Sequence, residues 1–485
     1  MKSPAFNVRK GREMSTQAKR IKVKKEVNMT EGPLFGKIIM FALPLMLSGI
    51  LQLLYNAADI VVVGRFAANG QTALAAVGST GALTNLIVNL FIGLSVGTSV
   101  SVSHALGAKN DDDVYKLVHT SILTSLIGGV IVSVIGITLA RPLLLLMDTP
   151  ESVIGFSALY MRIIFLGMPA QMLYNYGAAI LRAKGDTKRP LFILAVTGLV
   201  NVAMNLILVI GLHLDVAGVA IATITAQYLS AIFSTVFLIR DRGACHLDLR
   251  KLHIDRRSFM RLLRIGIPAG IQGMAFSISN VLIQSSVNSF GEIAMAGNTA
   301  GSNLDGFIYI ALNSLYHAAL TFTGQNVGAK KWSRLNRVML NCGAIVLSLG
   351  LVMGFGIYLL GEPLLAIYAP GEPDVIAWGM IRLKYLATTY FLCGLMEVAC
   401  GMLRGIGQSF TSMIISLTGT CALRVIWIYT IFALNPTMET LYLSYPVTWL
   451  ITLVIDLICF AIFKNRLIRH VNALEMAPAE TVTAK

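Results

Sequence analysis

Long apolar stretches recur along this chain, and they constrain its fold more than any other feature. A membrane-spanning helix needs about 20 consecutive, mainly apolar residues. Twelve stretches reach this length: 38–63, 73–105, 115–140, 155–181, 190–212, 216–239, 261–288, 293–326, 336–360, 378–403, 410–434 and 440–463. They predict an all-α polytopic membrane protein, because the short alternating strands of a membrane β-barrel give a different pattern.

Composition excludes the main soluble classes. Of the 485 residues 55% are hydrophobic and 13% are charged, whereas a soluble domain has about 25% charged residues. A chain this apolar is neither an ordinary soluble enzyme nor a disordered protein. The net charge of +15 does not indicate nucleic acid, because it lies in tails and loops. The six cysteines form no CxxC pair, so we expect no metal site and no cofactor.

Lysine and arginine are distributed unequally between alternate loops. Residues 1–37 contain ten Lys/Arg and three acidic residues, without the apolar core of a signal peptide. With this tail inside, the inside loops and the carboxyl tail carry Lys109, Lys116, Arg182, Lys184, Lys188, Arg189, eight residues between 240 and 264, Lys330, Lys331, Arg334, Arg337, Arg404, Lys464, Arg466, Arg469 and Lys485. The outside loops hold only Arg65 and Arg141. The positive-inside rule therefore places both termini in the cytoplasm.

The two halves of the chain match at a nearly constant offset, which indicates a duplicated six-helix unit. Gly107-Ala108-Lys109 recurs 221 residues later as Gly328-Ala329-Lys330, and Leu181-Arg182-x-x-Gly185 recurs 222 residues later as Leu403-Arg404-x-x-Gly407. Pro44 pairs with Pro268 in the same way. Repeats of this kind are typical of secondary transporters, with the substrate site between the halves.

The predicted organisation follows from the repeat and the polar gaps. A basic cytoplasmic tail (1–37) precedes an N-lobe of six helices (38–239), and a cytoplasmic loop (240–260) leads to a C-lobe of six helices (261–463). A second cytoplasmic tail (464–485) follows.

Several motifs resemble the multidrug and toxic compound extrusion (MATE) family of transporters, most closely its bacterial DinF-like and MepA-like branch. They are Met29-Thr30-Glu31-Gly32-Pro33-Leu34, Gln52-x-x-Tyr55-Asn56-x-x-Asp59 with Gly64-Arg65-Phe66, Ala73-Leu74-Ala75-Ala76-Val77-Gly78, Gly324-Gln325-Asn326-x-Gly328-Ala329-Lys330 and Leu403-Arg404-Gly405-x-Gly407-Gln408-Ser409. The resemblance covers about residues 29–465. It implies two six-helix lobes that form a V around a central cleft, a bacterial cytoplasmic membrane, and efflux of cationic, amphipathic compounds against inward H+ or Na+ flow.

A polar stripe on the first apolar stretch is the candidate ion-coupling site. Gln52, Tyr55, Asn56 and Asp59 fall at i, i+3, i+4 and i+7, and thus on one helical face. An aspartate inside a membrane helix costs about 2.5–3.5 kcal/mol on insertion scales, so it normally faces a cavity and has a function. Burial disfavours its ionised form, which suits a group that takes up and releases H+, and Na+ is the other candidate ion near Asp59. The alternative is a structural hydrogen bond.

Two asparagines in the stretch 190–212 are the predicted partners of Asp59. Asn201 and Asn205 lie four residues apart on one face. DinF-like relatives often have aspartate at the position of Asn205, so the resemblance leaves Asp59 as the one clear intramembrane acid of this lobe. The alternative is that both asparagines only join helices by hydrogen bonds.

The second half carries its polar stripe on the stretch 293–326. Asp305 is expected to attract a cation, and the cleft-facing charge is predicted to be acidic. The predicted substrate-binding residues are Gln52, Gln284, Asp305, Tyr309, Asn313, Tyr316 and Glu397. A solvated position is the alternative for Asp305, and an ion pair with Arg404 is the alternative for Glu397.

The sequence lacks the motifs of competing classes. It contains no GxxxxGK[ST] phosphate loop and no HExxH, which argues against a primary pump and against a metalloenzyme. We therefore predict a monomeric secondary antiporter, not an enzyme, whose partners are small organic cations or drugs and membrane lipids. A flippase for lipid-linked oligosaccharides is the alternative, and it is expected to have a more cationic cavity.

Overall fold

The computed structural model describes residues 26–66, 70–147 and 149–476, and within these ranges it consists of helices and short connections. The predicted tails are thus described only from Glu26 and only as far as Met476. Ten described helices are long and apolar enough to cross a membrane, and a pair that bends by 44° brings the number to eleven. Helix α10 (Glu292–Gly328) completes twelve, and its 37 residues include the polar stripe.

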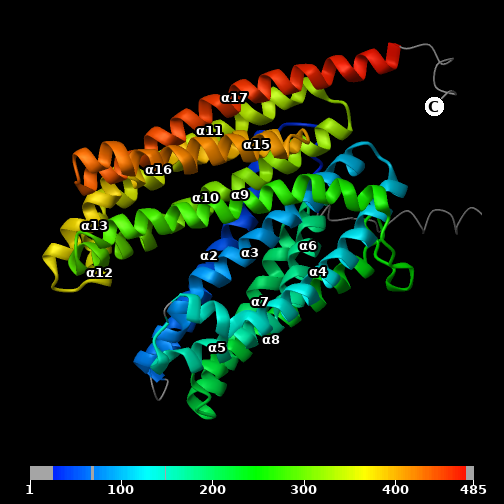
Figure 1. Ribbon diagram of the computed structural model, residues 1–485. Coiled ribbons are helices and arrows are strands. Elements are labelled where there is room, and N and C mark those ends of the chain that lie inside the picture. The colour runs from blue at the N-terminus through cyan, green and yellow to red at the C-terminus, as the bar shows by residue number, and fades with distance from the viewer. Residues whose placement is uncertain (1–25, 67–69, 148, 477–485) are drawn as a thin grey trace, which may run out of the picture.

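The helices form two bundles that converge at one end and diverge at the other, like a V (Figure 1). The N-lobe contains α2 (Phe35–Phe66), α3 (Gly70–Gly107), α4 (Asp111–Leu146), α5 (Glu151–Leu166), α6 (Met168–Lys184), α7 (Lys188–Asn205), η1 (Leu206–Gly211) and α8 (Asp215–Ile239). A loop with the short η2 (Leu249–Lys251) connects it to the C-lobe. The C-lobe contains α9 (Arg256–Asn288), α10, α11 (Trp332–Leu359), α12 (Gly361–Tyr368), α13 (Pro373–Tyr385), η3 (Ala387–Thr389), α14 (Tyr390–Gly405), α15 (Ser409–Ser416), η4 (Leu417–Ala422), α16 (Leu423–Trp427), η5 (Ile428–Phe432) and α17 (Met438–Met476). The all-α fold with two six-helix lobes is confirmed.

Interruptions divide some spans that the sequence predicts as single helices. The stretch 155–181 bends between α5 and α6 at Gly167, and the stretch 378–403 is interrupted by η3. The π-helical segments η1 and η5 widen the helices after Asn205 and after Trp427. Such wide turns are frequent at functional sites.

The repeat extends to the backbone conformation. Lys109 and Lys330, at equivalent positions of the two GAK motifs, both have φ 54°, which is rare for residues other than glycine. Gly185 and Gly407, which follow the ends of α6 and α14, have φ 94° and 90°. Two connections of the same left-handed type, repeated at offsets of 221 and 222 residues, support duplication of the six-helix unit.

Glycines allow the lobes to touch from the middle of α3 to the end at which α2 begins and α3 ends, called the closed end here. A Cβ on Gly93 of α3 would lie 2.4 Å from the Cα of Gly270 on α9, and a Cβ on Gly107 would lie 2.0 Å from the carbonyl oxygen of Gln325. Neither space admits a side chain. At mid-height Asn89 Nδ2 donates to Ser277 Oγ at 3.0 Å, and beyond this level the bundles diverge (Figure 1).

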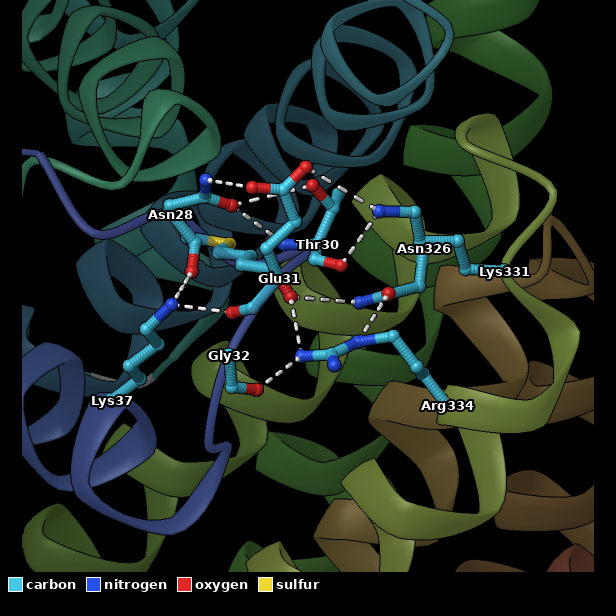
Figure 2. A network of polar contacts seen from close by, with 9 residues as sticks. Asn28, Thr30, Glu31, Gly32, Lys37, Asn326, Lys331 and Arg334 are labelled. Carbon is cyan, nitrogen blue, oxygen red and sulfur yellow. Dashed lines mark hydrogen bonds and ion pairs between the residues drawn. The ribbon is translucent and has the colours of Figure 1, made fainter.

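Residues 26–34, called the strap, cross the closed end and bind both lobes (Figure 2). The Val27 N–H donates to Gly185 O of the N-lobe at 3.1 Å. On the C-lobe side the Met29 carbonyl accepts from Asn326 Nδ2 at 3.2 Å, and the Gly32 carbonyl accepts from Arg334 Nη2 at 3.1 Å. The Met29 side chain is fully buried in the C-lobe core.

Removal of residues 1–28 is expected to lower thermal stability, because the Val27 hydrogen bond and buried side chain are lost together with the ion pair of Glu26 with Lys184 at 2.7 Å. The two Val27 contributions amount to about 2–3 kcal/mol. Removal of residues 1–25, which keeps the strap, is the matched control. Equal melting temperatures of the two truncated proteins in detergent would contradict a structural role of the strap.

Candidate functional site

The N-lobe site joins α2 to α7 through a carboxylate and two amides. Asn205 Nδ2 donates to Asp59 Oδ1 and lies 3.4 Å from Asn201 Oδ1. Asn205 is fully buried, Asn201 is nearly so, and Asp59 is half-buried. The structure therefore brings together the acid and the two asparagines that the sequence singles out.

Tyr55 holds α2 and α7 together one turn from Asp59. Its hydroxyl donates to the Ala195 carbonyl at 3.3 Å. Its ring lies on Gly198, where a Cβ would come within 1.7 Å of the ring carbon Cε2. Gln52 and Asn56 lie beside this row but are exposed, so the polar stripe divides into a buried and an accessible row.

The chemistry available at this site is cation binding. The Oδ1 atom of Asn205 is buried without a hydrogen-bond partner among the described residues. An amide beside a carboxyl group can donate to the ionised form and, after rotation, accept from the protonated form. Among the described residues no group of three or more His, Cys, Asp or Glu side chains has the arrangement of a metal site.

The C-lobe contains a partly open cavity of about 370 Å³. It is large enough for part of a drug-sized molecule, since ligand pockets measure about 300–1,000 Å³. Its polar and aromatic lining includes Asn280, Gln284, Asn298, Ser302, Asp305, Tyr309, Arg382, Tyr390, Glu397, Thr420, Arg424, Tyr445 and Trp449. Gln284, Asp305, Tyr309 and Glu397 were predicted from the sequence to bind substrate.

Asp305 is neither solvated nor free. It is 2% exposed, and one of its oxygens accepts a hydrogen bond from Arg382 Nε at 2.9 Å. Arg382 Nη1 also donates to Asn298 Oδ1 at 2.7 Å, and Tyr442 Oη donates to the same oxygen at 2.8 Å. The carboxylate that was expected to attract a cation is thus already neutralised by a guanidinium group.

Three further residues that the sequence singles out in the C-lobe, Tyr316, Asn313 and Arg404, lie away from the cavity. Arg404 donates to Tyr316 Oη at 2.5 Å and to Gln272 Oε1 at 2.6 Å, and within the described ranges it forms no ion pair with Glu397. Tyr316 is buried in that contact, and neither it nor Asn313 lines the cavity. Helix α10 has 37 residues and packs against more than one neighbouring helix. The polar residues of its predicted stripe therefore do not all face the same cavity.

The charge of the cavity is mixed, which corrects the expected acidic lining. Two acids, Asp305 and Glu397, face it together with two arginines, Arg382 and Arg424. Both arginines were left out of the predicted site. The available signal was their position inside apolar stretches, since a charge at membrane depth generally faces a cavity or a partner.

Comparison with known proteins gives consistent matches over most of the chain. The sequence profile of the MatE family matches residues 44–207 and 268–430. The "Probable multidrug resistance protein YoeA" of Bacillus subtilis is 29% identical over 385 residues, which are 78% of this chain and 82% of that protein. An "FAD transporter" of Shewanella oneidensis is 23% identical over 396 residues, covering 80% of this chain and 86% of that protein.

A solved structure has the same fold. It is that of a transporter of the MOP superfamily from Pyrococcus furiosus, whose title states that reverse polarity of its binding pocket suggests a different function. It superposes with a TM-score of 0.85 at 22% identity and covers 92% of this chain and 99% of the other. At this identity the likeness concerns the fold.

Proposed function

This chain belongs to the MatE family of multi-pass membrane transporters, and we propose that it is a secondary antiporter. It exports amphipathic organic compounds in exchange for H+ or Na+. The hydrogen-bonded pair of Asp59 and Asn205 is the observation that carries this proposal. It consists of a half-buried carboxylate and an amide that can either donate a hydrogen bond to it or, after rotation, accept one from it. Such a group binds a cation in one conformation and releases it in another.

The coupling step takes place between α2 and α7. Asp59 holds the cation, and Asn205 and Asn201 adjust their amides to the charged or the neutral carboxyl group. Tyr55 fixes the distance between the two helices. Coupling requires that cation and substrate have different affinities for the two conformations.

Alternating access uses the contact between the lobes. Glycines and the strap hold the closed end together, and a rocking motion opens this end while it brings the diverging ends together. Lys184, Lys331 and Arg334 lie at the closed end. By the positive-inside rule this end is cytoplasmic, with both termini, and the described conformation faces outward. The setting is a bacterial cytoplasmic membrane, in which the protein acts as a monomer surrounded by lipids.

The C-lobe cavity is the proposed substrate site, with Gln284, Tyr309 and Glu397 as contact residues. Because Asp305 is paired, amphipathic compounds fit the cavity better than simple cations. A flippase is expected to have a more cationic cavity, and the two arginines of this cavity therefore weaken the argument from charge against a flippase. Nevertheless a cavity of about 370 Å³ has the size for a small molecule, which favours a small substrate over a lipid-linked oligosaccharide.

Transport by the purified protein in liposomes tests the proposal. Vesicles are loaded with ethidium or with flavin mononucleotide, and an inward gradient of either H+ or Na+ is imposed. One gradient is expected to accelerate release of at least one compound, and collapse of that gradient with an ionophore removes the acceleration. Equal release with and without either gradient would contradict the proposed antiport.

A further inference from the structure

Arg424 lies in α16, between the π-helical segments η4 and η5, and faces the C-lobe cavity. It is 4% exposed. Its guanidinium carbon lies 4.1 Å from the centre of the Tyr445 ring and 6.0 Å from that of Trp449. The Nε atom donates to Thr448 Oγ1 at 3.3 Å. Aromatic rings and a hydroxyl therefore fix the orientation of the side chain.

The described residues provide no counter-charge for Arg424. They place no carboxylate within ion-pair distance of it, and its two terminal nitrogens have no hydrogen-bond partner among them. The other arginine of the cavity, Arg382, is neutralised by Asp305 at 2.9 Å. A buried charge without a counter-charge is costly, particularly at membrane depth. Arg424 is thus the one cavity arginine in the described ranges that is free to bind an anionic group.

The wall beside Arg424 is aromatic. Trp449 lies 5.3 Å from Tyr390 and 5.5 Å from Tyr445, measured between ring centres. All three rings line the cavity. Flat rings of a ligand pack well on such a surface. Glu397 also lines the cavity without an ion pair among the described residues, and its carboxylate accepts hydrogen bonds from donor groups of a ligand.

We propose that the C-lobe cavity binds aromatic organic anions, with the phosphate or carboxylate group at Arg424, the ring on Trp449 and Tyr445, and hydroxyl or N–H groups toward Glu397. Guanidinium groups bind such anions through paired hydrogen bonds. The inference names the substrate class and rests on the proposed export function. Binding of anions differs from the binding of cations that the sequence predicted. A cation site would need an acidic side chain without an ion-pair partner and no free arginine beside it.

The test uses two flavins that differ in one group. Flavin mononucleotide carries a phosphate monoester, and riboflavin has the same ring and ribityl chain without it. Binding to the purified full-length protein in detergent is measured by quenching of flavin fluorescence. We expect flavin mononucleotide to bind at least about ten-fold more tightly, because a charge-assisted hydrogen-bond pair is lost without the phosphate. Equal affinities, or tighter binding of riboflavin, would overturn the inference.

Variants assign the preference to Arg424. Arg424→Gln is expected to remove the preference for flavin mononucleotide and to leave riboflavin binding nearly unchanged, whereas Arg424→Lys keeps part of it. Arg466→Gln, at an exposed position of α17, is the matched control for loss of one positive charge. If Arg424→Gln unfolds the protein, Arg424→Lys and the wild-type preference still decide the question. A preference that survives in folded Arg424→Gln would place the phosphate elsewhere and reject the proposal.

Substitution of Glu397 is expected to change the affinity for flavin mononucleotide in the opposite direction to substitution of Arg424. Glutamine keeps a carbonyl oxygen that accepts hydrogen bonds from the ligand but lacks the negative charge that repels an anion in the same cavity, so Glu397→Gln is expected to raise the affinity for flavin mononucleotide. A lowered affinity would contradict the proposed arrangement. The binding assay needs no ion gradient, so it is independent of coupling. Selective binding without gradient-driven transport would reject the proposed antiport alone, and gradient-driven transport without phosphate selectivity would reject this inference alone.

Discussion

Asp59→Asn is expected to abolish gradient-driven transport and to leave substrate binding intact. Asparagine has the shape of aspartate and keeps a hydrogen bond with Asn205, but it neither takes up a proton nor supplies a charge for Na+. When one proton exchanges for one substrate molecule, a pH gradient of one unit is worth about 1.4 kcal/mol and supports about ten-fold accumulation. In Asp59→Asn this accumulation falls to the equilibrium value.

The comparison needs controls for folding and for the chemistry of the site. Asp59→Glu, which keeps the carboxyl group, is expected to retain part of the transport activity. Asp305→Asn changes an acid that is already paired with Arg382, and it is expected to affect stability more than coupling. Expression and the flavin affinity in detergent identify folded protein. Normal accumulation by Asp59→Asn would remove Asp59 from the coupling mechanism.

Gly93→Val is expected to prevent α3 and α9, and with them the two lobes, from meeting at mid-height. A Cβ at Gly93 would lie 2.3 Å from the Gly270 nitrogen, which is backbone and has no alternative rotamer. The substitution therefore destabilises the described conformation by several kcal/mol, as overpacking of a close contact does. Transport is expected to stop, because alternating access needs both conformations.

A matched control lies on the same helix. A Cβ added to Gly81 of α3 would meet no atom within 4 Å, so Gly81→Val is expected to transport normally. Spin labels at Gly64 and Tyr368, on the diverging ends of α2 and α12, report the conformation in a cysteine-free background. Gly93→Val is expected to shorten their separation. An unchanged separation with normal transport would show that this contact does not limit the cycle.

Much of the fold follows from local sequence. Apolar length predicts the spans, and the GAK and LRxxG motifs predict the duplication because they recur at a nearly constant offset. The left-handed turns of their lysines and glycines at equivalent places agree with it. The breaks are harder to predict. The bend at Gly167 and the interruption by η3 depend on packing between helices, and neither changes the hydropathy of its stretch.

The candidate site was predictable only where local sequence identifies its residues. Asn205 is recognisable as a partner of Asp59, since both are polar positions on otherwise apolar helices. The pairing of Asp305 with Arg382 joins residues 77 positions apart, on α10 and α13. No spacing rule connects them. The neutrality of that pair and the missing counter-charge of Arg424 could therefore be recognised only from the packing of the C-lobe in the structure.

Cation release on substrate binding tests the central role of Asp59 most directly. Purified protein in weakly buffered detergent solution is mixed with a saturating amount of a transported compound, while a pH indicator follows H+ and radioactive sodium follows Na+. Since coupling between two ligands is reciprocal, the wild type is expected to release about one cation per protein molecule, and Asp59→Asn none. Equal release by Asp59→Asn and the wild type would contradict the account.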